Sequence, residues 1–243
     1  TQISVGSNHS CARLSNGTLK CWGYNGQGQL GNGNTSERRT PVAVNTLTGV
    51  AEVGAGSQHS CALKADGTVW CWGRDTARNY GSNPFQIAGL ANVTSLAVGY
   101  NHSCARRTGG TVQCWGNGNS GRLGDNSTSN RYPPVLVTNM VNAEKVSAGW
   151  SHTCVTMTDK RLSCWGSGGN YRQLNGSTSE RRTPYTSPYV SGVLSVAAGN
   201  NFSCVRTSTE VLCGGRNNVG QIAGSDTTGD VTRPKRISDL VTR

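Results

Sequence analysis

The chain has 243 residues, of which 33 are glycine and only two each are Phe and Met, and 14% carry a charged side chain. This composition disfavours a helical bundle with a core of Leu, Phe and Met and favours a loop-rich all-β protein. Lys and Arg number 23 against 12 for Asp and Glu, a net charge of +11 that permits an anionic partner but also suits simple solubility.

One sequence unit occurs five times and fills the chain. Each copy opens with a Gly-x-x-His-Ser-Cys string or a close version of it, and the leading glycines are Gly6, Gly56, Gly99, Gly149 and Gly199. The intervals are 50 residues, except for 43 after the second glycine, where one loop is short. A period of this length without 3.6-residue apolar spacing is typical of propeller blades rather than of helical solenoids.

Each copy predicts four short strands. In chain order these are an apolar stretch such as residues 50–53 or 193–197, a hairpin, and a last strand after proline, such as residues 42–44 or 135–137. This pattern predicts a five-bladed β-propeller of four-stranded antiparallel blades that forms a single domain over residues 1–243. Residues 1–5 and 235–238 would complete one shared blade, unless the copies belong to a larger wheel or close by dimerising.

The ten cysteines fall at matching places in the five hairpins. In the first copy, a three-residue loop at residues 15–17, with Gly17 in the left-handed position, makes Cys11 face Cys21. In the next three copies the loop also lies midway between the two cysteines, so these cysteines face each other as well. In the fifth copy the cysteines are one residue closer in sequence, and a two-residue loop still makes them face each other. Facing side chains are close enough to bond, so we expect one disulfide per blade. The expected pairs are Cys11 with Cys21, Cys61 with Cys71, Cys104 with Cys114, Cys154 with Cys164, and Cys204 with Cys213.

Disulfides persist in oxidising compartments, so we expect the protein to be secreted, periplasmic or displayed on a cell surface. No apolar run approaches the ~20 residues that cross a bilayer. The chain starts at Thr1 without a basic-then-apolar leader, so any signal peptide has been removed. Two alternatives to disulfides are weaker: the Cys-x-x-Cys pairs of zinc sites are missing, and reduced core thiols would leave five opposed pairs unexplained.

Three segments carry a resemblance to a known family: Asn8-His9-Ser10, Cys21-Trp22-Gly23, and residues 28–31 with a second version at 121–124. The unit resembles the repeat of the regulator of chromosome condensation (alpha-tubulin suppressor-like) family, whose usual members are seven-bladed propellers. Here there are five copies, cysteines flank each hairpin, and Gly214 and Phe202 replace the usual Trp and His. The cysteines fit the secreted bacterial members, among them inhibitors of β-lactamases, and do not suit the nuclear exchange-factor role of the founding member.

The resemblance implies that the turn after each leading glycine lies on one face near the propeller axis and contacts protein partners. The first position of this turn varies on an otherwise repeated frame, as a recognition surface requires, and Tyr100 and Trp150 would be its aromatic anchors. The candidate binding residues are Asn8, His9, Gln58, His59, Tyr100, Asn101, His102, Trp150, Ser151, His152, Asn200, Asn201 and Phe202.

The repeated histidines and tryptophans also have structural interpretations. We expect each His to hydrogen-bond backbone within its own blade, since a ring spaced by whole blades is too wide for one metal. Adjacent His and Ser in a strand point to opposite faces, which is poor geometry for proton transfer, so we expect no catalysis, no cofactor and no metal. The tryptophans expected to pack between blades are Trp22, Trp72, Trp115 and Trp165.

We therefore expect an extracellular, non-catalytic recognition or adhesion module that binds a protein or a surface polymer through one propeller face, and a secreted enzyme inhibitor is an alternative. A lectin-like alternative would bind sugar with the Gly/Asn loops at residues 25–27, 117–119 and 217–218. A nucleic-acid or acidic-polymer alternative would use a basic rim, although basic side chains on outer strands also prevent edge-to-edge pairing. The rim consists of Arg38, Arg39, Arg181, Arg182, Lys235 and Arg236.

Overall fold

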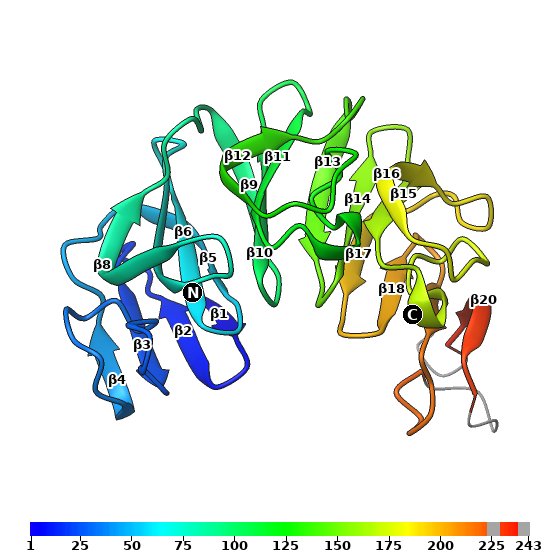
Figure 1. The fold of residues 1–243 in the computed structure, drawn as a ribbon. Helices are drawn as coiled ribbons and strands as arrows, with labels where there is room; N and C mark the ends of the chain where they lie inside the picture. Colours follow the sequence, from blue (N-terminus) through cyan, green and yellow to red (C-terminus); the bar gives the residue numbers. More distant parts are fainter. Residues whose placement is uncertain (223–228, 238–243) are drawn as a thin grey trace. The chain divides into compact units, whose positions relative to one another are not determined.

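The computed structural model describes residues 1–222 and 229–237. Within them the chain is all-β, with five four-stranded sheets and two single-turn 3-10 helices, and each sheet is one sequence copy (Figure 1). The predicted five blades of four antiparallel strands are confirmed. We number them blade 1 to blade 5 in chain order.

Spatial order follows chain order in every blade, so the first and fourth strands form the two edges of each sheet. Blade 1 contains β1 (Gln2–Val5), β2 (His9–Arg13), β3 (Leu19–Gly23) and β4 (Arg38–Ala43). Blade 2 contains β5 (Val50–Ala55), β6 (His59–Lys64), β7 (Val69–Arg74) and β8 (Asn79–Gln86). Blade 3 contains β9 (Val93–Val98), β10 (His102–Arg107), β11 (Val112–Gly116) and β12 (Arg131–Leu136), with η1 (Asn119–Gly121) before β12. Blade 4 contains β13 (Ala143–Ala148), β14 (His152–Met157), β15 (Leu162–Gly166) and β16 (Arg181–Thr186), with η2 (Gly169–Tyr171) before β16. Blade 5 contains β17 (Ser195–Ala198), β18 (Phe202–Arg206), β19 (Val211–Gly215) and β20 (Val231–Arg236).

The chain forms two compact units. Unit 1 holds blades 1 and 2 and most of blade 3, and it comprises Thr1–Thr108, Gln113–Asn117 and Asn130–Val135. Unit 2 holds blades 4 and 5 and the rest of blade 3, and it comprises Gly109–Val112, Gly118–Ser129 and Leu136–Arg243. Each unit has apolar clusters of its own that join successive blades.

The hairpin between the second and third strands sets the register that pairs the cysteines. In blade 1, the Leu14 N–H donates to Thr18 O (2.9 Å), and Gly17 closes the three-residue loop with a φ of 74°. Cys11 therefore faces Cys21, and the two form a disulfide. A left-handed φ at the third loop position is why glycine recurs there.

The shorter hairpin of blade 5 reaches the same result. The Thr207 N–H donates to Glu210 O (2.9 Å) around a two-residue loop, which places Cys204 opposite Cys213. All five predicted disulfides are present, and no cysteine of the chain is free. One covalent cross-link thus closes the central hairpin of every blade.

The fourth strands begin earlier than predicted. β4 starts at Arg38 and contains Pro41, and β12 contains Pro133 and Pro134, whereas we expected strands that follow the proline. Each of these strands is an outer edge, where a residue without an N–H need not interrupt the hydrogen-bond ladder. The basic segments before the prolines are therefore parts of the sheets.

The two ends of the chain pair within their own copies. β1 pairs with β2, with Gln2 opposite Arg13, and β20 pairs with β19, with Val231 opposite Gly215. The prediction that residues 1–5 and 235–238 complete a shared blade is wrong, because each terminal copy supplies all four strands of its own sheet. The last residue of that predicted strand, Ser238, lies outside the described residues.

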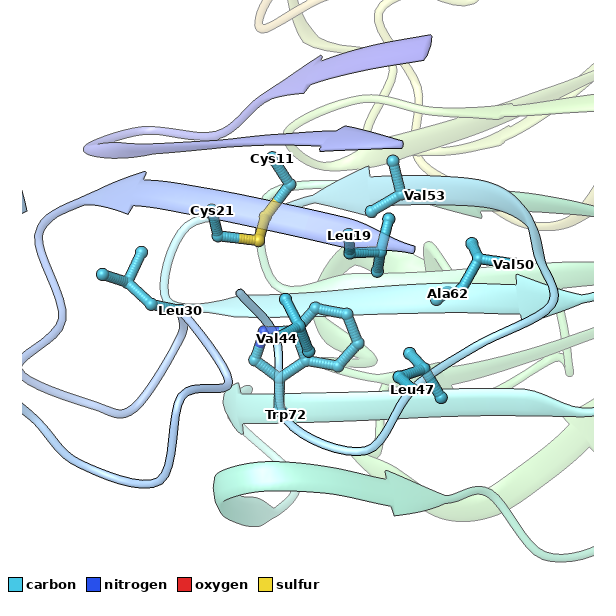
Figure 2. Packing of buried hydrophobic residues seen from close by; sticks show 10 residues of the cluster. All are labelled: Cys11, Leu19, Cys21, Leu30, Val44, Leu47, Val50, Val53, Ala62 and Trp72. Atoms are coloured by element: carbon cyan, nitrogen blue, oxygen red, sulfur yellow. A yellow bond between two sulfur atoms is a disulfide. The ribbon is translucent and has the colours of Figure 1, made fainter. Parts of the chain in front are cut away.

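Apolar packing around a tryptophan joins blade 1 to blade 2. Trp72 of β7 is fully buried against Leu30 and Val44 of blade 1, next to the disulfide of that blade (Figure 2). Its indole N–H donates to Gln29 O (2.8 Å), so the one polar atom of the side chain also has a partner in the neighbouring blade.

The other tryptophans of this motif are also buried where a blade precedes them, although the indole N–H of Trp115 has no hydrogen-bond partner among the described residues. Trp115 is fully buried in a cluster with side chains of blade 2. Trp165 is fully buried as well, and its indole N–H donates to Arg122 O (2.9 Å). The prediction of packing between blades is confirmed for these residues, whereas Trp22, in the first blade, is only half-buried.

Two glycines with positive φ make room for the tryptophan rings. Gly31 has a φ of 69°, and a Cβ there would lie 2.9 Å from the ring Cδ1 of Trp72. Gly124 has a φ of 74°, and a Cβ there would lie 2.7 Å from Nε1 of Trp165. A side chain at either glycine would collide with an indole that cannot move away.

At the junction with blade 5 the large and the small residue exchange places. Gly214 stands where the other blades have the tryptophan, and Leu174 stands where the loops of the preceding copies have Gly31 and Gly124. Leu174 keeps the left-handed backbone, with a φ of 56°, and is fully buried. A Cβ on Gly214 would lie 2.7 Å from Cδ2 of Leu174. The leucine therefore fills the volume that an indole fills at the other junctions.

This exchange predicts a strong coupling between the two positions. Leu174→Gly should lower the free energy of unfolding by about 2 kcal/mol, because the loss from the cavity exceeds the relief of the left-handed backbone. Gly214→Trp alone should also destabilise, since the indole would collide with Leu174. The double variant should recover stability by more than 1 kcal/mol relative to the sum of the two losses, as measured by urea unfolding.

A matched control is Leu30→Gly combined with Gly214→Trp, because the apolar cluster around Leu30 consists of residues of blades 1 and 2. Its two effects should add. Additive effects in the Leu174 and Gly214 pair as well would contradict the exchange.

Candidate functional site

The turns between the first and second strands share one backbone frame. In blade 1, the Gly6 N–H donates to His9 O (2.9 Å), and the Tyr24 N–H donates to Asn8 O (2.8 Å). A Cβ at Gly23 would lie 2.6 Å from Asn8 O, so the close approach requires glycine. Both hydrogen bonds recur in the other four blades at 2.8 to 2.9 Å. The frame is thus fixed from both sides, while the two central side chains of the turn are free to differ between blades.

The candidate residues divide into an exposed and a buried set. Each exposed side chain belongs to one of the two central positions of a turn, whereas every His lies in the interior. Exposed residues are Ser7, Asn8, Gln58, Trp150 and Asn200, and partly exposed residues are Tyr100, Asn101, Asn201 and Phe202. Buried residues are His9, Ser57, His59, His102, Ser151 and His152. Unit 1 carries the exposed residues of blades 1 to 3, and unit 2 carries those of blades 4 and 5.

The histidines join one blade to the next. His9 Nε2 lies 2.8 Å from Ser60 Oγ of blade 2, and Ser60 Oγ donates to Gln29 O (2.9 Å). The prediction that the ring bonds backbone within its own blade is wrong. The reason is the leading glycine, because a Cβ on Gly6 would lie 2.8 Å from the ring Cε1. The imidazole lies over that glycine and reaches across to the neighbouring strand.

The contact recurs along the chain. His59 Nε2 lies 3.0 Å from Ser103 Oγ, and His152 Nε2 lies 2.7 Å from Ser203 Oγ. Ser203 Oγ in turn donates to Arg172 O (2.7 Å). A hydroxyl has one proton, so a serine that donates to a carbonyl accepts from the ring, and these histidines are the neutral tautomers that carry the proton on Nε2.

Burial keeps these rings neutral. It lowers the pKa of His9 to about 4, with a smaller effect of nearby His59, and lowers the pKa of His152 to about 3, with further effects of Arg172 and Arg122. Nδ1 of His9 and of His152 is buried and has no hydrogen-bond partner among the described residues. Protonation would therefore place a buried N–H without an acceptor. Because the serine proton is held by a carbonyl, these His-Ser contacts support the fold rather than a nucleophile.

The buried histidines predict acid sensitivity. Their pKa in the folded protein lies below 6.5, so the unfolded chain binds protons first and stability falls as the pH drops from 6.5 toward 4. The double variant His9→Gln with His152→Gln keeps an amide N–H donor but does not titrate, so its loss over this range should be smaller. Urea unfolding at pH 7, 5.5 and 4.5 measures both, and equal losses would contradict the assignment.

The first asparagine of each loop proposed for sugar binding is buried. Asn25 is fully buried, its Nδ2 donates to Asn34 O (2.9 Å) and Ser36 O (3.0 Å), and its Oδ1 accepts from the Leu30 N–H (2.9 Å). Asn117 and Asn217 are also buried. Asn117 Nδ2 donates to Thr76 Oγ1 (3.3 Å) and Asn217 Oδ1 accepts from the Ile222 N–H (2.8 Å), whereas Asn119 and Asn218 of the same loops are exposed.

The basic rim lies on the outer strands β4, β16 and β20. Three of its arginines lie beside carboxylates, which offset part of the local charge, and basic side chains at a sheet edge oppose pairing with another edge. The pairs are Arg39 with Glu37 (3.9 Å), Arg182 with Glu180 (2.9 Å) and Arg236 with Glu210 (3.8 Å). Within the described residues, no helix could span a membrane, and no three His, Cys, Asp or Glu side chains are grouped as metal ligands.

The chain matches the regulator of chromosome condensation (RCC1) repeat at residues 16–63 and 109–156, and in a second form of that repeat at residues 1–29, 50–81, 93–122 and 143–173. These matches span more than half of the chain. They include the turns and hairpins of the first four copies.

The fold is similar to those of three solved proteins. Human WBSCR16 has 21% identity and a TM-score of 0.84, with 98% of this chain and 67% of that chain covered. Prp20p, the RCC1 of Saccharomyces cerevisiae, whose structure was reported with its binding to Gsp1p and histones, has 23% identity and a TM-score of 0.80, with 98% and 63% covered. The ectodomain of the Arabidopsis thaliana receptor kinase ACR4 has 22% identity and a TM-score of 0.51, with 88% and 64% covered.

The described chain thus spans about two thirds of the length of these proteins. The repeat matches, the five similar blades and the one disulfide in each blade together show that this chain belongs to the regulator of chromosome condensation (RCC1) repeat family, in a disulfide-containing form.

Proposed function

We propose that this chain is an extracellular, non-catalytic recognition module that binds a protein partner through the exposed residues of its Gly-x-x-His turns. The observation that carries the proposal is Trp150, whose side chain is 42% exposed at the first variable position of the blade 4 turn. Exposure of a large apolar ring to water is unfavourable, and exposed tryptophans on rigid scaffolds are frequent centres of protein interfaces.

The backbone around Trp150 is held in place before any partner arrives. The Gly149 N–H donates to His152 O (2.9 Å), and the Trp150 N–H donates to Gly199 O of the next turn (3.1 Å). Arg122 Nη1 donates to Trp150 O (3.0 Å). A turn fixed by three hydrogen bonds loses little conformational entropy on binding, which favours affinity.

Solved proteins with this fold support a protein as the partner class. Yeast RCC1 has been solved bound to Kap60, and Prp20p was described with its binding to Gsp1p and histones. The same architecture therefore presents protein-binding surfaces elsewhere. The identity of those partners is not transferred, since this chain shares 21 to 23% identity with these proteins.

The disulfides support a location outside the cytoplasm. All ten cysteines are paired, and thiol-reducing compartments do not maintain five such bonds. Similar structures include ectodomains of plant receptor kinases, which face the cell exterior. Adhesion to a surface would be one use of such a module.

The partner can be captured from extracellular fluid with immobilised protein and its affinity measured with purified components. Trp150→Ala should weaken binding by about 30-fold, the effect of removing an anchor worth ~2 kcal/mol, without changing the unfolding midpoint by more than the control does. Tyr189→Ala is the matched control, because Tyr189 is an aromatic residue of the same unit with the same 42% exposure but lies outside the turns. Equal affinities of the two variants would contradict the proposal.

Unit 1 offers a second test, at the equivalent position of its own turns. Tyr100, which is partly exposed at the equivalent position of blade 3, should weaken binding when changed to Ala if the partner also contacts unit 1. An effect of Trp150 without an effect of Tyr100 would restrict the binding surface to blades 4 and 5.

The location is tested on native material. Alkylation of the unreduced protein with maleimide, followed by intact-mass measurement, should add no label, because every thiol is oxidised. Labelling of all ten cysteines would contradict both the disulfides and the extracellular assignment.

A further inference from the structure

Two nearly buried arginines lie against the turn that presents Trp150. Arg122 and Arg172 are each 7% exposed. Arg122 donates from Nη1 to Trp150 O (3.0 Å), and Arg172 donates from Nη1 to Ser151 Oγ (2.5 Å). The two guanidinium groups therefore contact successive residues of one turn, and all of these residues belong to unit 2.

No carboxylate of the described residues forms a hydrogen bond or an ion pair with either arginine. Arg122 Nε donates to Asn119 O (2.8 Å), and Arg172 Nε donates to Gly169 O (2.6 Å). The other acceptors of Arg172 are a carbonyl and an amide oxygen, each at 3.4 Å. Within the described residues every partner is thus a neutral oxygen. Burial lowers the pKa of Arg172, and the charge of Asp230, whose Oδ2 accepts from Asn170 Nδ2 (2.8 Å), opposes this shift.

Burying two cations side by side is unfavourable unless a negative charge compensates them. The unfavourable interaction is visible at Arg122, where burial and the charge of Arg172 lower the pKa to about 10. Nη2 of Arg122 makes no hydrogen bond with a described residue.

The fold does not require arginine at these positions. In blade 1 the equivalent residue is Gln29, a neutral side chain that is fully buried. Its carbonyl accepts from Ser60 Oγ (2.9 Å), as the carbonyl of Arg122 accepts from Thr153 Oγ1 (2.9 Å). The junction between blades uses the backbone of this residue. The guanidinium groups are therefore additional to the framework, and they occur only at the loops that flank the Trp150 turn.

We propose that Arg122 and Arg172 form a binding site for a small oxyanion, a carboxylate or a phosphate group, beside the Trp150 turn. The planar donors of arginine match the paired oxygens of these groups, and a low-dielectric setting strengthens the contact. The biological use of this site rests on the proposed function: the protein partner would carry an anionic group that binds the two arginines. Anion binding itself is a property of the isolated protein and can be measured without the partner.

The experiment measures thermal unfolding of the purified protein at constant ionic strength, with chloride replaced by inorganic phosphate or by succinate. A tenfold excess over the dissociation constant should raise the unfolding midpoint by about 3 °C. A rise with phosphate alone identifies a phosphate site, and a rise with succinate identifies a carboxylate site. No rise with either anion would overturn the proposal.

Variants separate a binding role from a structural one. Arg122→Gln, which copies Gln29, should abolish the anion-dependent rise, whereas Arg39→Gln should retain it, because the side chain of Arg39 is 93% exposed and its removal changes the net charge equally. Equal loss in both variants would show unspecific charge screening and overturn the site.

Titration of the unmodified protein with phosphate, followed through the arginine Nε–H resonances, keeps the test valid if Arg122→Gln does not fold. Saturable shifts of the Arg122 and Arg172 resonances support the site, and linear shifts overturn it. Failure of the partner-binding proposal would be recognised separately, since Trp150→Ala would then leave partner affinity unchanged while the anion response persists.

Discussion

At the junction between blades 1 and 2, a single backbone oxygen holds one blade to the next. Gln29 O accepts from the hydroxyl of Ser60 (2.9 Å) and from the indole of Trp72 (2.8 Å), both of which belong to blade 2. A carbonyl has two lone pairs, so this atom is fully used. Since the hydroxyl proton is committed here, His9 can only donate to Ser60, and its ring has to stay neutral. Packing, tautomer and charge state of the junction thus follow from one acceptor.

Because the junction uses the backbone carbonyl of this residue, the side chain of the residue can differ between blades. The residue that supplies the carbonyl is Gln29 in blade 1 but Arg122 and Arg172 further along the chain, and the junction geometry is kept. The turns behave in the same way, because their frame is built from backbone hydrogen bonds while their central side chains differ. The side chains that we propose for recognition therefore vary at positions where the fold makes no demand on the side chain.

Local geometry and the packing of the tryptophans between blades were predictable from the sequence, whereas the polar contacts between blades were not. The pairing of Cys11 with Cys21 follows from the hairpin loop between them, because side chains alternate with a period of two along each strand. The contact of His9 with Ser60 joins residues 51 positions apart, and no local pattern indicates it. For the same reason the sequence placed the histidines on a surface, although neighbouring blades bury them.

The candidate site was predictable in part. The variation of residues such as Trp150 on a fixed frame marked the turns correctly as the place where exposed side chains differ. Arg122 lies in the repeated segment 121–124, but a sequence does not show whether a basic side chain is buried. The start of each fourth strand was predicted too late, because we expected the strand to follow the proline. An edge strand such as β4 accommodates Pro41.

The exchange of Leu174 and Gly214 has a consequence for how this repeat array can evolve. Similar units invite recombination, and a chain with blades deleted, duplicated or reordered would still hold recognisable repeats. Such a rearrangement could bring the loop that carries Leu174 against a blade with an indole, or leave Gly214 facing another glycine. One junction would then be overfilled or hollow. The complementary side-chain volumes at this junction therefore favour one order of the blades, even though the sequences of the blades are similar.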